Sequence, residues 1–507
     1  MILKNMTSEL ENKIERFNQD LEQAKDYFLK HLGEFDSITR VYTHIDADGL
    51  SAGSIIGKAL YRENLPFQIN ILRQLEREEI IKIANNEYNG FMIFCDFGSG
   101  QYLDLQKELL LKGYKGHFII LDHHLPQNIG NKQEVDKIED IHIETSPWHI
   151  NPYFYGVDGS TGISGSSICY FFAKCLNDKN IDLSPIAVVG SIGDIQNQGP
   201  NKSFSGLNSL VIEDAKKAGL IEIVDDLNFS TIKPLNEAIA YSSDIKLPGL
   251  TGETNKALKF LQTLGILMEN PDGSVKTLND MNKDDKQKIS SAIIEYATLK
   301  LNIEPVEIIK KLIVNRYLLV DEVDSELRDA DEFSNLLNAC GRTDNGSLGI
   351  AIAMGDRNKA LLQSKDVLLN YKKSLLRALS WISEEDKIQQ KAHVQFFFGE
   401  EVIPENIIGT VSSMLVFDKR DIIDKNKPIF GCALREEQGV YKISGRASKK
   451  LVNKGLNLSE VIREALELSN LDALGGGHPP AAGTKVPVDK IEVFLENCNS
   501  VVKKQLE

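Results

Sequence analysis

Short apolar segments alternate with amphipathic segments over the first part of the chain. From residue 38 onward the apolar runs are ITRVYT, FQINIL, FMIFC and HFIIL, and helical patterns such as EREEIIKIA and YLDLQKELLL separate them. Apolar runs of this length predict buried strands, and their alternation with helices predicts β-α-β order. We therefore predict an α/β fold here, with a parallel sheet between two layers of helices.

Three other regions carry different patterns. Residues 8–32 repeat apolar side chains at helical spacing and predict an amphipathic helix that lies across the following domain. From about 200 to 330, segments rich in Lys, Asp and Glu, including KKLIVNRYLLV, predict a helical insertion. After it, SLGIAIAMGD, HVQFFFGEEVI, KPIFGCAL and VYKISGRAS predict the strands of a second sheet.

These changes of pattern predict four regions in a chain of 507 residues, which is too long for one ordinary core. The expected regions are an N-terminal helix at 1–34, a parallel-sheet domain at 35–200, a helical insertion or connector at 201–330, and a smaller α/β domain at 331–507.

Composition narrows the class of protein. No apolar run approaches the ~18 residues that a membrane span needs, and the charged N-terminus lacks the features of a signal peptide. The six cysteines are scattered without a Cys-x-x-Cys pair, so neither zinc ribbons nor a disulfide framework is expected. We expect a cytoplasmic protein without a membrane partner. Its net charge of -15 argues against coating nucleic acid, although a local basic groove stays compatible with it.

Acidic and histidine residues stand where the predicted strands end. In open parallel sheets ligands bind at the carboxyl edge, so these groups are expected to converge in one crevice. The residues are His44, Asp46, Asp48, Asp96, Asp122, His123, His124 and, after a later apolar segment, Asp194.

Carboxylates and imidazoles without a thiolate suit manganese or magnesium better than structural zinc. Clustered carboxylates repel one another unless cations neutralise them, and two metal ions would also activate water for phosphoryl displacement. Each piece has a plainer reading: Asp48-Gly49 as a turn, Asp46 as a helix cap, the His-His pair as packing. Only their convergence favours a two-metal hydrolase.

The second domain suggests contacts to phosphate. Gly475, Gly476 and Gly477 before His478 would let backbone amides approach an anion. Just upstream lies a basic strip without acidic residues: Lys442, Arg446, Lys449, Lys450 and Lys454. A hairpin turn followed by a solvated helix face explains the same residues equally well.

Together these motifs resemble the DHH phosphoesterase superfamily. HIDADG, the aspartate of FCDFG, LDHH and the aspartate of GSIGD resemble its four motifs, and KISGR with GGGHPPAAG resembles the signature of the DHH-associated domain. The chain length and the segment LRDADEFSNLLNACGRTDNGSLGIAIAMGD are similar to archaeal RecJ-like exonucleases, including those that associate with the GINS replication complex.

The resemblance implies roles for individual residues. The implied metal ligands are His44, Asp46, Asp48, Asp96, His123 and Asp194, and the implied catalytic set is Asp48, Asp122, His123 and His124. Arg446 and the loop of Gly475, Gly476, Gly477 and His478 would hold the nucleic-acid backbone. Two divalent ions are implied, with manganese expected and magnesium as the alternative. The motif begins with His44 where bacterial RecJ proteins usually carry aspartate, which leaves the metal preference open.

The function implied is exonucleolytic hydrolysis of single-stranded nucleic acid in replication or repair, with DNA and 5′-to-3′ digestion expected. One alternative is a replisome scaffold that binds GINS through residues 201–330 and catalyses little. A second alternative is a phosphodiesterase for short oligoribonucleotides, against which the basic strip and the insertion argue.

Overall fold

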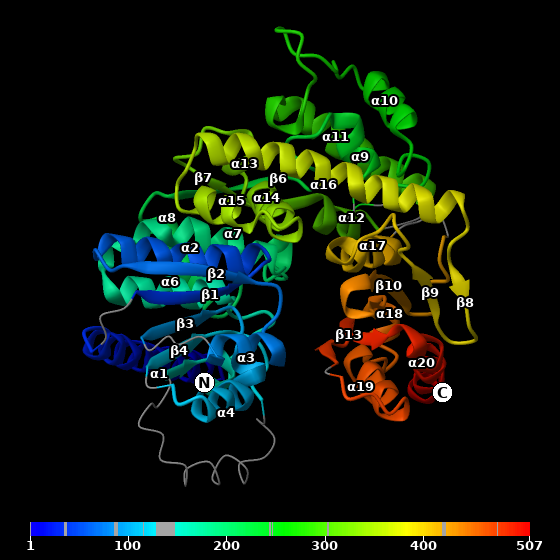
Figure 1. Ribbon diagram of the computed structural model, residues 1–507. Helices are drawn as coiled ribbons and strands as arrows, with labels where there is room; N and C mark the ends of the chain where they lie inside the picture. The colour runs from blue at the N-terminus through cyan, green and yellow to red at the C-terminus, as the bar shows by residue number, and fades with distance from the viewer. Residues whose placement is uncertain are drawn as a thin grey trace. The chain divides into compact units, whose positions relative to one another are not determined.

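The computed structural model describes residues 2–34, 38–85, 90–114, 116–127, 148–242, 245, 247–301, 304–417, 422–473 and 475–507. Contacts divide the chain into two compact units, Met1–Lys365 and Asp366–Glu507, which Figure 1 labels element by element. The boundaries predicted at 34/35, 200/201 and 330/331 stay predictions. Among the helices that lie in the described ranges, none is long and apolar enough to cross a membrane.

The first unit is built on a parallel sheet, as predicted. Its strands lie in the order β2-β1-β3-β4-β5, and every neighbouring pair is parallel. The chain therefore leaves β1 for β2 on one side and returns to β3 on the other. The strands are β1 Thr39–His44, β2 Phe67–Leu72, β3 Phe91–Cys95, β4 His117–Leu121 and β5 Trp148–Ile150.

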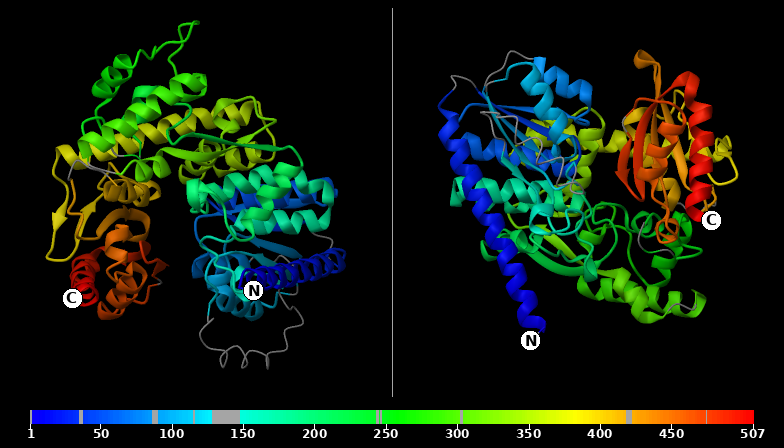
Figure 2. Two further views of the ribbon diagram at one scale, coloured as in Figure 1. Left: turned by 180° about the vertical axis from the view of Figure 1, so that it is seen from behind. Right: turned by 90° about the horizontal axis from the view of Figure 1, so that it is seen from below.

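Helices cover both faces of this sheet (Figures 1 and 2). On one face, α3 (Arg77–Asn85) and α4 (Tyr102–Leu111) bury Ile80 and Leu105 against Phe94 and Ile120 of the strands. On the other face, α2 (Ala47–Arg62) and α6 (Gly165–Leu176) contact the strands, with α7 (Ser184–Gly193) and α8 (Asn208–Lys217) behind them. The strands β3 and β4 are buried on both faces, which explains why they read as continuous apolar runs.

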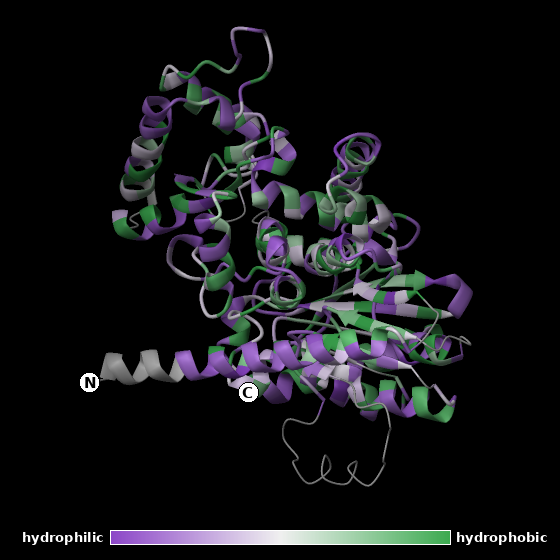
Figure 3. Cartoon of the chain, turned by 90° about the vertical axis from the view of Figure 1, so that its left-hand side faces the viewer, coloured by the Kyte–Doolittle hydropathy of each residue, from purple (hydrophilic) through white to green (hydrophobic). Residues whose placement is uncertain are grey.

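The predicted N-terminal helix is confirmed as α1, Ile2–Leu32. Its apolar stripe, which includes Phe17, Leu21 and Phe28, is buried against α6 and the sheet. Phe28 packs edge-on against Phe91 of β3 at 4.9 Å between ring centroids. Figure 3 shows hydrophilic residues along the outward side of the described part of α1, which fits a helix that covers one side of a core.

The region from 220 to 320 contains more than helices. Strands β6 (Ile221–Leu227) and β7 (Ile313–Leu319) pair antiparallel, and the helices between them enclose a separate apolar core. Those helices are α9 Leu235–Ala240, α10 Thr254–Thr263, α11 Lys283–Leu301 and α12 Pro305–Leu312. The helical prediction for 310–320 was wrong after residue 312, because IVNRYLL alternates buried and partly exposed side chains along a strand.

Another predicted strand is a helix. SLGIAIAMGD contains α15, Gly346–Ala353, which packs against α2 beside α14, Ala330–Arg342, with the short α13, Ser325–Arg328, before them. A short, fully apolar segment does not distinguish strand from buried helix by periodicity. The long helix α16, Lys359–Glu384, follows and spans the boundary between the units.

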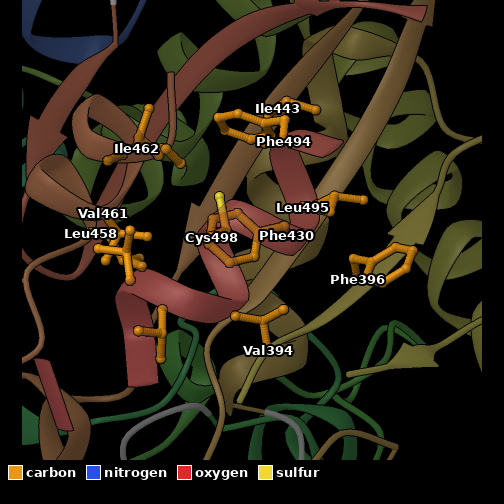
Figure 4. Close-up of a cluster of buried hydrophobic side chains, with 14 of the residues drawn as sticks. Val394, Phe396, Phe430, Ile443, Leu458, Val461, Ile462, Phe494, Leu495 and Cys498 are labelled. Carbon is orange, nitrogen blue, oxygen red and sulfur yellow. The ribbon is translucent and has the colours of Figure 1, made fainter. Parts of the chain in front are cut away.

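The second unit holds the predicted second sheet, in the order β12-β13-β11-β10-β9-β8. The strands are β8 Gln389–Gln390, β9 Gln395–Phe398, β10 Ile429–Arg435, β11 Val440–Arg446, β12 Gly476–His478 and β13 Ala481–Pro487. The helices of this unit after α16 are α17 Glu405–Phe417, α18 Lys449–Val452, α19 Leu458–Leu468 and α20 Ile491–Leu506. Figure 4 shows its own core, where Phe430 of β10 meets Phe494 and Cys498 of α20.

Candidate metal centre

Three neighbouring strands bring the predicted residues to one edge of the parallel sheet. His44 is the last residue of β1, Asp96 follows β3 directly, and Asp122 follows β4 directly. The order of the strands reverses between β1 and β3, which is the switch point where open α/β sheets bind ligands. The predicted convergence of these motifs is therefore observed.

The turn between β1 and α2 presents the first motif. Asp46 is the N-cap of α2, and its Oδ1 accepts a 3.0 Å hydrogen bond from the Gly49 amide. Glycine is required at 49 because an added Cβ would lie 2.4 Å from the carbonyl oxygen of His44. Asp46 thus serves as the cap that the plainer reading expected, while its Oδ2 lies 3.0 Å from His44 Nδ1.

Asp48 faces the other way, into the protein. Its side chain is 1% exposed, and its two oxygens accept hydrogen bonds from the amides of Gly165 (2.7 Å) and Ser166 (3.0 Å). These amides begin α6, so the carboxylate also meets the positive end of that helix. Asp48 therefore joins α2 to α6 as well as lying at the candidate site.

Asp96 lies at the middle of the group. It adopts a left-handed backbone conformation with φ of 63°, which is uncommon for a residue with a side chain and is concentrated at functional sites. Its Oδ2 lies 3.5 Å from His44 Nδ1, and its Oδ1 lies 3.2 Å from His123 Nε2. An added Cβ at Gly165 would lie 2.6 Å from Asp96 Oδ1, so glycine permits this close approach of α6.

His123 is oriented by a backbone carbonyl. Its Nδ1 donates to the carbonyl oxygen of Gly159 at 2.7 Å, so Nε2 is directed at the carboxylates. Besides Asp96, that nitrogen lies 3.7 Å from Oδ2 of both Asp48 and Asp194. A histidine that donates one nitrogen to a carbonyl and presents the other among carboxylates has the usual arrangement of a metal ligand.

Gln196 links two of these residues. Its Nε2 donates to Asp194 Oδ2 and to the Gly159 carbonyl oxygen, both at 2.8 Å, and its Oε1 accepts from Asn208 at 2.8 Å. The Gly159 carbonyl oxygen also accepts the hydrogen bond from His123 Nδ1. The buried side-chain amide of Gln196 therefore fixes both Asp194 and the carbonyl that orients His123. Sequence reasoning missed Gln196; its position two residues after Asp194 was the one available signal.

Asp122 and His124 form a pair beside the group. Asp122 Oδ1 lies 2.8 Å from His124 Nδ1, and Asp122 Oδ2 accepts from the Ser99 amide at 2.9 Å. The Asp122 carboxylate is fully buried, whereas the His124 side chain is 40% exposed. Asp122 therefore orients the His124 ring, and this ring lies 4.4 Å from the ring of His123 between centroids.

The six implied ligands divide into two groups that fit two cations. His44, Asp46 and Asp96 form one group, and Asp48, His123 and Asp194 form the other; within each, ligand atoms lie within 4.8 Å of one another. Asp96 offers an oxygen to each group. His44 Nδ1, Asp96 Oδ1 and His123 Nε2 are buried and make no hydrogen bond, although carboxylates lie near them. Buried nitrogen and oxygen atoms that lie close together and lack hydrogen bonds are suitable ligands for divalent metals that prefer oxygen.

The ionisable side chains of this group have strongly shifted pKa values. Burial, and after it the Asp96 carboxylate, raise the pKa of Asp48 well above its usual range. Burial works against a charged His123, yet the Asp194 and Asp96 carboxylates raise the pKa of this imidazole well above its usual value. The same opposition holds at His44, where Asp46 and Asp96 outweigh burial and raise its pKa. Cations at the two groups would relieve this repulsion.

The residues expected to contact substrate lie in the second unit. Arg446 ends β11, and its guanidinium donates to Ser413 Oγ and to the Gly445 carbonyl oxygen, both at 2.8 Å. Gly476, Gly477 and His478 form the exposed edge strand β12, and Gly475 precedes it. The glycine-rich segment is therefore a hairpin, as the plainer reading expected, and its role toward phosphate stays a prediction.

Two family models match separate parts of the chain. Residues 230–313 match the DHH-CID domain, and residues 390–504 match the DHHA1 domain. The Uncharacterized protein MJ0831 of Methanocaldococcus jannaschii is 33% identical over 497 residues, which cover 97% of this chain and 99% of that protein.

Solved structures share the fold at low identity. RecJ in complex with Mn²⁺ from Thermus thermophilus aligns with 96% of this chain at a TM-score of 0.53 and 16% identity, and this chain spans 55% of its length. A second exonuclease RecJ bound to manganese gives 0.54 at 15% identity, with coverage of 96% and 94%. CDC45 from Entamoeba histolytica gives 0.61 at 13% identity, with coverage of 95% and 99%.

The fold is that of RecJ-like proteins. The chain belongs to the DHH superfamily, and it shares its family with MJ0831 of M. jannaschii. Membership of this superfamily supports phosphoesterase or nuclease chemistry with divalent metal ions.

Proposed function

We propose that this protein is a metal-dependent exonuclease that hydrolyses phosphodiester bonds of single-stranded nucleic acid, with DNA as the expected substrate and 5′-to-3′ as the expected direction. The observation that carries the proposal is the pair of adjacent ligand groups, His44–Asp46–Asp96 and Asp48–His123–Asp194, which Asp96 connects through its oxygen 3.2 Å from His123 Nε2. Divalent ions bound there would lower the pKa of a water and neutralise charge on the phosphate oxygens.

The residues of the chain have distinct parts in this proposal. Two ions would be held by His44, Asp46, Asp48, Asp96, His123 and Asp194, with manganese expected and magnesium as the alternative. Gln196 and the Gly159 carbonyl keep His123 and Asp194 in place before any ion arrives. This arrangement limits the reorganisation that metal binding and catalysis require.

His124 is proposed to contact the scissile phosphate. Asp122 fixes its ring through Nδ1, and although burial lowers the pKa of His124, the Asp122 carboxylate raises it overall. A protonated imidazole at this place would donate to a phosphate oxygen and offset its negative charge. In the second unit, Arg446 and the Gly475–His478 segment are proposed to hold the nucleic-acid backbone.

The direct test uses oligonucleotides of DNA and RNA, labelled at either end, with Mn²⁺, with Mg²⁺ and with chelator. The proposal predicts stepwise shortening of DNA from the 5′ end with Mn²⁺ and none with chelator. Rapid cleavage of dinucleotides with slow cleavage of long strands would instead favour the oligoribonuclease reading. Absence of cleavage with every metal would contradict the enzyme proposal.

A second proposed role is docking on GINS through the inserted region. Two observations favour a docking surface there: residues 230–313 form a separately matched domain, and its helices expose apolar side chains. Val306 and Ile309, 59% and 43% exposed, lie three residues apart on α12, and Leu299 of α11 is 73% exposed.

Paired variants test this role. Val306→Ser combined with Ile309→Ser should abolish co-purification with GINS and leave hydrolysis of short strands unchanged. The matched control is Leu111→Ser, at an apolar position on α4 that is 68% exposed outside the insertion. Equal recovery of GINS with all of these proteins would contradict docking through α12.

A further inference from the structure

A second group of ligand-type side chains lies at the opposite edge of the parallel sheet. His31 is close to the end of α1, Glu34 follows that helix, and His117 is the first residue of β4. Ligand atoms of the three lie within 4.8 Å of one another. Asp122 follows the far end of β4, so a strand of this length separates the group from the metal centre by about 16 Å.

Glu34 joins the two histidines. Its Oε1 lies 2.6 Å from His31 Nδ1, and its Oε2 lies 3.1 Å from His117 Nε2. The imidazole rings stack with centroids 3.9 Å apart and planes 28° apart. The side chains of His31 and His117 are 14% and 8% exposed, whereas Glu34 is 45% exposed, so the group is reached from solvent on the side of the carboxylate.

The arrangement favours one shared cation over two protonated rings. Two imidazolium ions stacked at this distance would repel each other strongly in a site that is mostly shielded from water. A divalent metal, by contrast, binds neutral imidazoles together with an ionised carboxylate. The three residues offer that donor set at one point.

Tyr27 provides the support that metal-binding histidines usually have. Its hydroxyl lies 2.6 Å from His117 Nδ1, which fixes the ring so that Nε2 is directed at Glu34. The Tyr27 ring also packs against the rings of both histidines, at 4.7 Å from His31 and 5.4 Å from His117. The orientation of both rings is therefore set by the surrounding fold.

We propose that His31, Glu34 and His117 bind a zinc ion, separate from the metal centre. Two imidazoles and one carboxylate form a set that zinc takes with water as the fourth ligand, whereas the oxygen-rich centre at the other edge suits manganese or magnesium. A zinc ion here would tie the end of α1 to the start of β4.

The test measures zinc binding and does not depend on hydrolysis. The parent is the full chain with Asp96→Asn, which removes the carboxylate that lies between His44 and His123 of the metal centre. Glu34→Gln and His31→Ala are compared in this parent, and Glu22→Gln is the control because Glu22 also lies on α1, where it pairs with Lys25. Each protein is titrated calorimetrically with Zn²⁺ at pH 7, and its Tm is measured with Zn²⁺ and with chelator.

The proposal predicts that Zn²⁺ raises the Tm of the parent and of Glu22→Gln. Glu34→Gln and His31→Ala should weaken zinc binding at least about tenfold and lose that rise in Tm. A plain hydrogen-bonded cluster would lower the Tm of the metal-free variants yet leave the effect of zinc unchanged. That result, or a parent whose Tm does not respond to zinc, would overturn the proposal.

Discussion

Asp48 shows how one side chain can serve both a site and a fold. A carboxylate near two ligand groups could act through its charge alone, but both oxygens of Asp48 also accept the first amides of α6. Replacement by alanine would therefore remove the acceptor of two α6 amides together with a candidate metal ligand, and loss of activity in that variant would have two explanations.

Comparing two variants separates these roles. Asp48→Asn and Asp48→Ala both remove the charge, yet only asparagine retains an oxygen that can accept from the Gly165 or Ser166 amide. We predict that both lose metal-dependent hydrolysis and that Asp48→Asn is more stable than Asp48→Ala by about 1–3 kcal/mol. Urea unfolding in metal-free buffer measures the difference, and equal midpoints would show that the hydrogen bonds from the α6 amides to residue 48 contribute nothing to stability.

His149 gives a prediction for pH. It lies 2.6 Å from Ser99 Oγ, and burial lowers its pKa to about 4. Because the unfolded chain takes up this proton near pH 6.5 and the folded chain does not, the stability contributed by neutral His149 is lost as the pH falls from about 6.5 toward 4.

The variant His149→Gln isolates that effect. Between pH 7 and pH 5 the parent should lose about 1–2 kcal/mol more of its free energy of unfolding than His149→Gln does, after allowance for partial exposure. Chemical unfolding of both proteins at the two pH values gives this difference. If both proteins lose the same amount, His149 is protonated as readily in the folded state as in the unfolded state.

Single residues were predictable from sequence where they stand at strand ends. His44 ends β1, and Asp96 and Asp122 directly follow β3 and β4, so topology alone brings them together. Gln196, Gly159 and the amides of α6 reach the site through contacts between segments far apart in sequence, and local patterns carry no information about such contacts. The long-range partners are therefore what sequence reasoning missed.

At the scale of elements, α1 is the clearest case of a packed amphipathic helix. Phe28 is fully buried between Phe91 of β3 and Phe172 of α6, while its neighbour Leu29 is 50% exposed. We predict that Phe28→Ala lowers the free energy of unfolding by about 3–5 kcal/mol, because it leaves a cavity under α1. Leu29→Ala should change it by less than about 1 kcal/mol.

Denaturant unfolding of the two alanine variants makes the comparison. Similar losses from both would mean that α1 does not pack on the sheet through its apolar stripe. The result also bears on the zinc proposal, since that site lies at the end of the same helix.

Elements differ in how well their patterns predicted them. The strands of the parallel sheet are short apolar runs that alternate with helices, and β3 and β4 are fully buried, so length and order were sufficient to predict them. The segment of α15 is as apolar as a buried strand because Gly349, Ile350 and Ile352 face neighbouring helices, and periodicity could not separate the two. The prediction failed at β7 for a different reason. The charged residues that precede its apolar segment made the whole stretch resemble an amphipathic helix.

At the scale of the whole molecule, a net charge of -15 opposes nucleic-acid binding. The basic strip of the second unit can offset this negative charge locally. Its residues Lys449 and Lys454 are exposed. We predict that Lys449→Glu with Lys454→Glu, in an Asp96→Asn protein, weakens binding of single-stranded DNA about tenfold and reduces the salt dependence of binding.

The control carries the same change of charge elsewhere. Lys503→Glu with Lys504→Glu alters two exposed lysines of α20. Fluorescence anisotropy of a labelled strand across several salt concentrations compares the two proteins. Equal weakening would show that only the total charge matters and that the strip has no specific part.

The most direct test of a two-metal centre is to count Mn²⁺ bound to the protein and to its Asp96→Asn variant, with hydrolysis of labelled single-stranded DNA measured on the same samples. Asp96 Oδ2 lies 3.5 Å from His44 Nδ1, and Asp96 Oδ1 lies 3.2 Å from His123 Nε2. We therefore predict two ions at the centre of the parent, weakened binding of both in the variant, and at least about a thousandfold loss of hydrolysis, roughly 4 kcal/mol of barrier. A variant that binds Mn²⁺ and cleaves DNA as the parent does would contradict a centre built around Asp96.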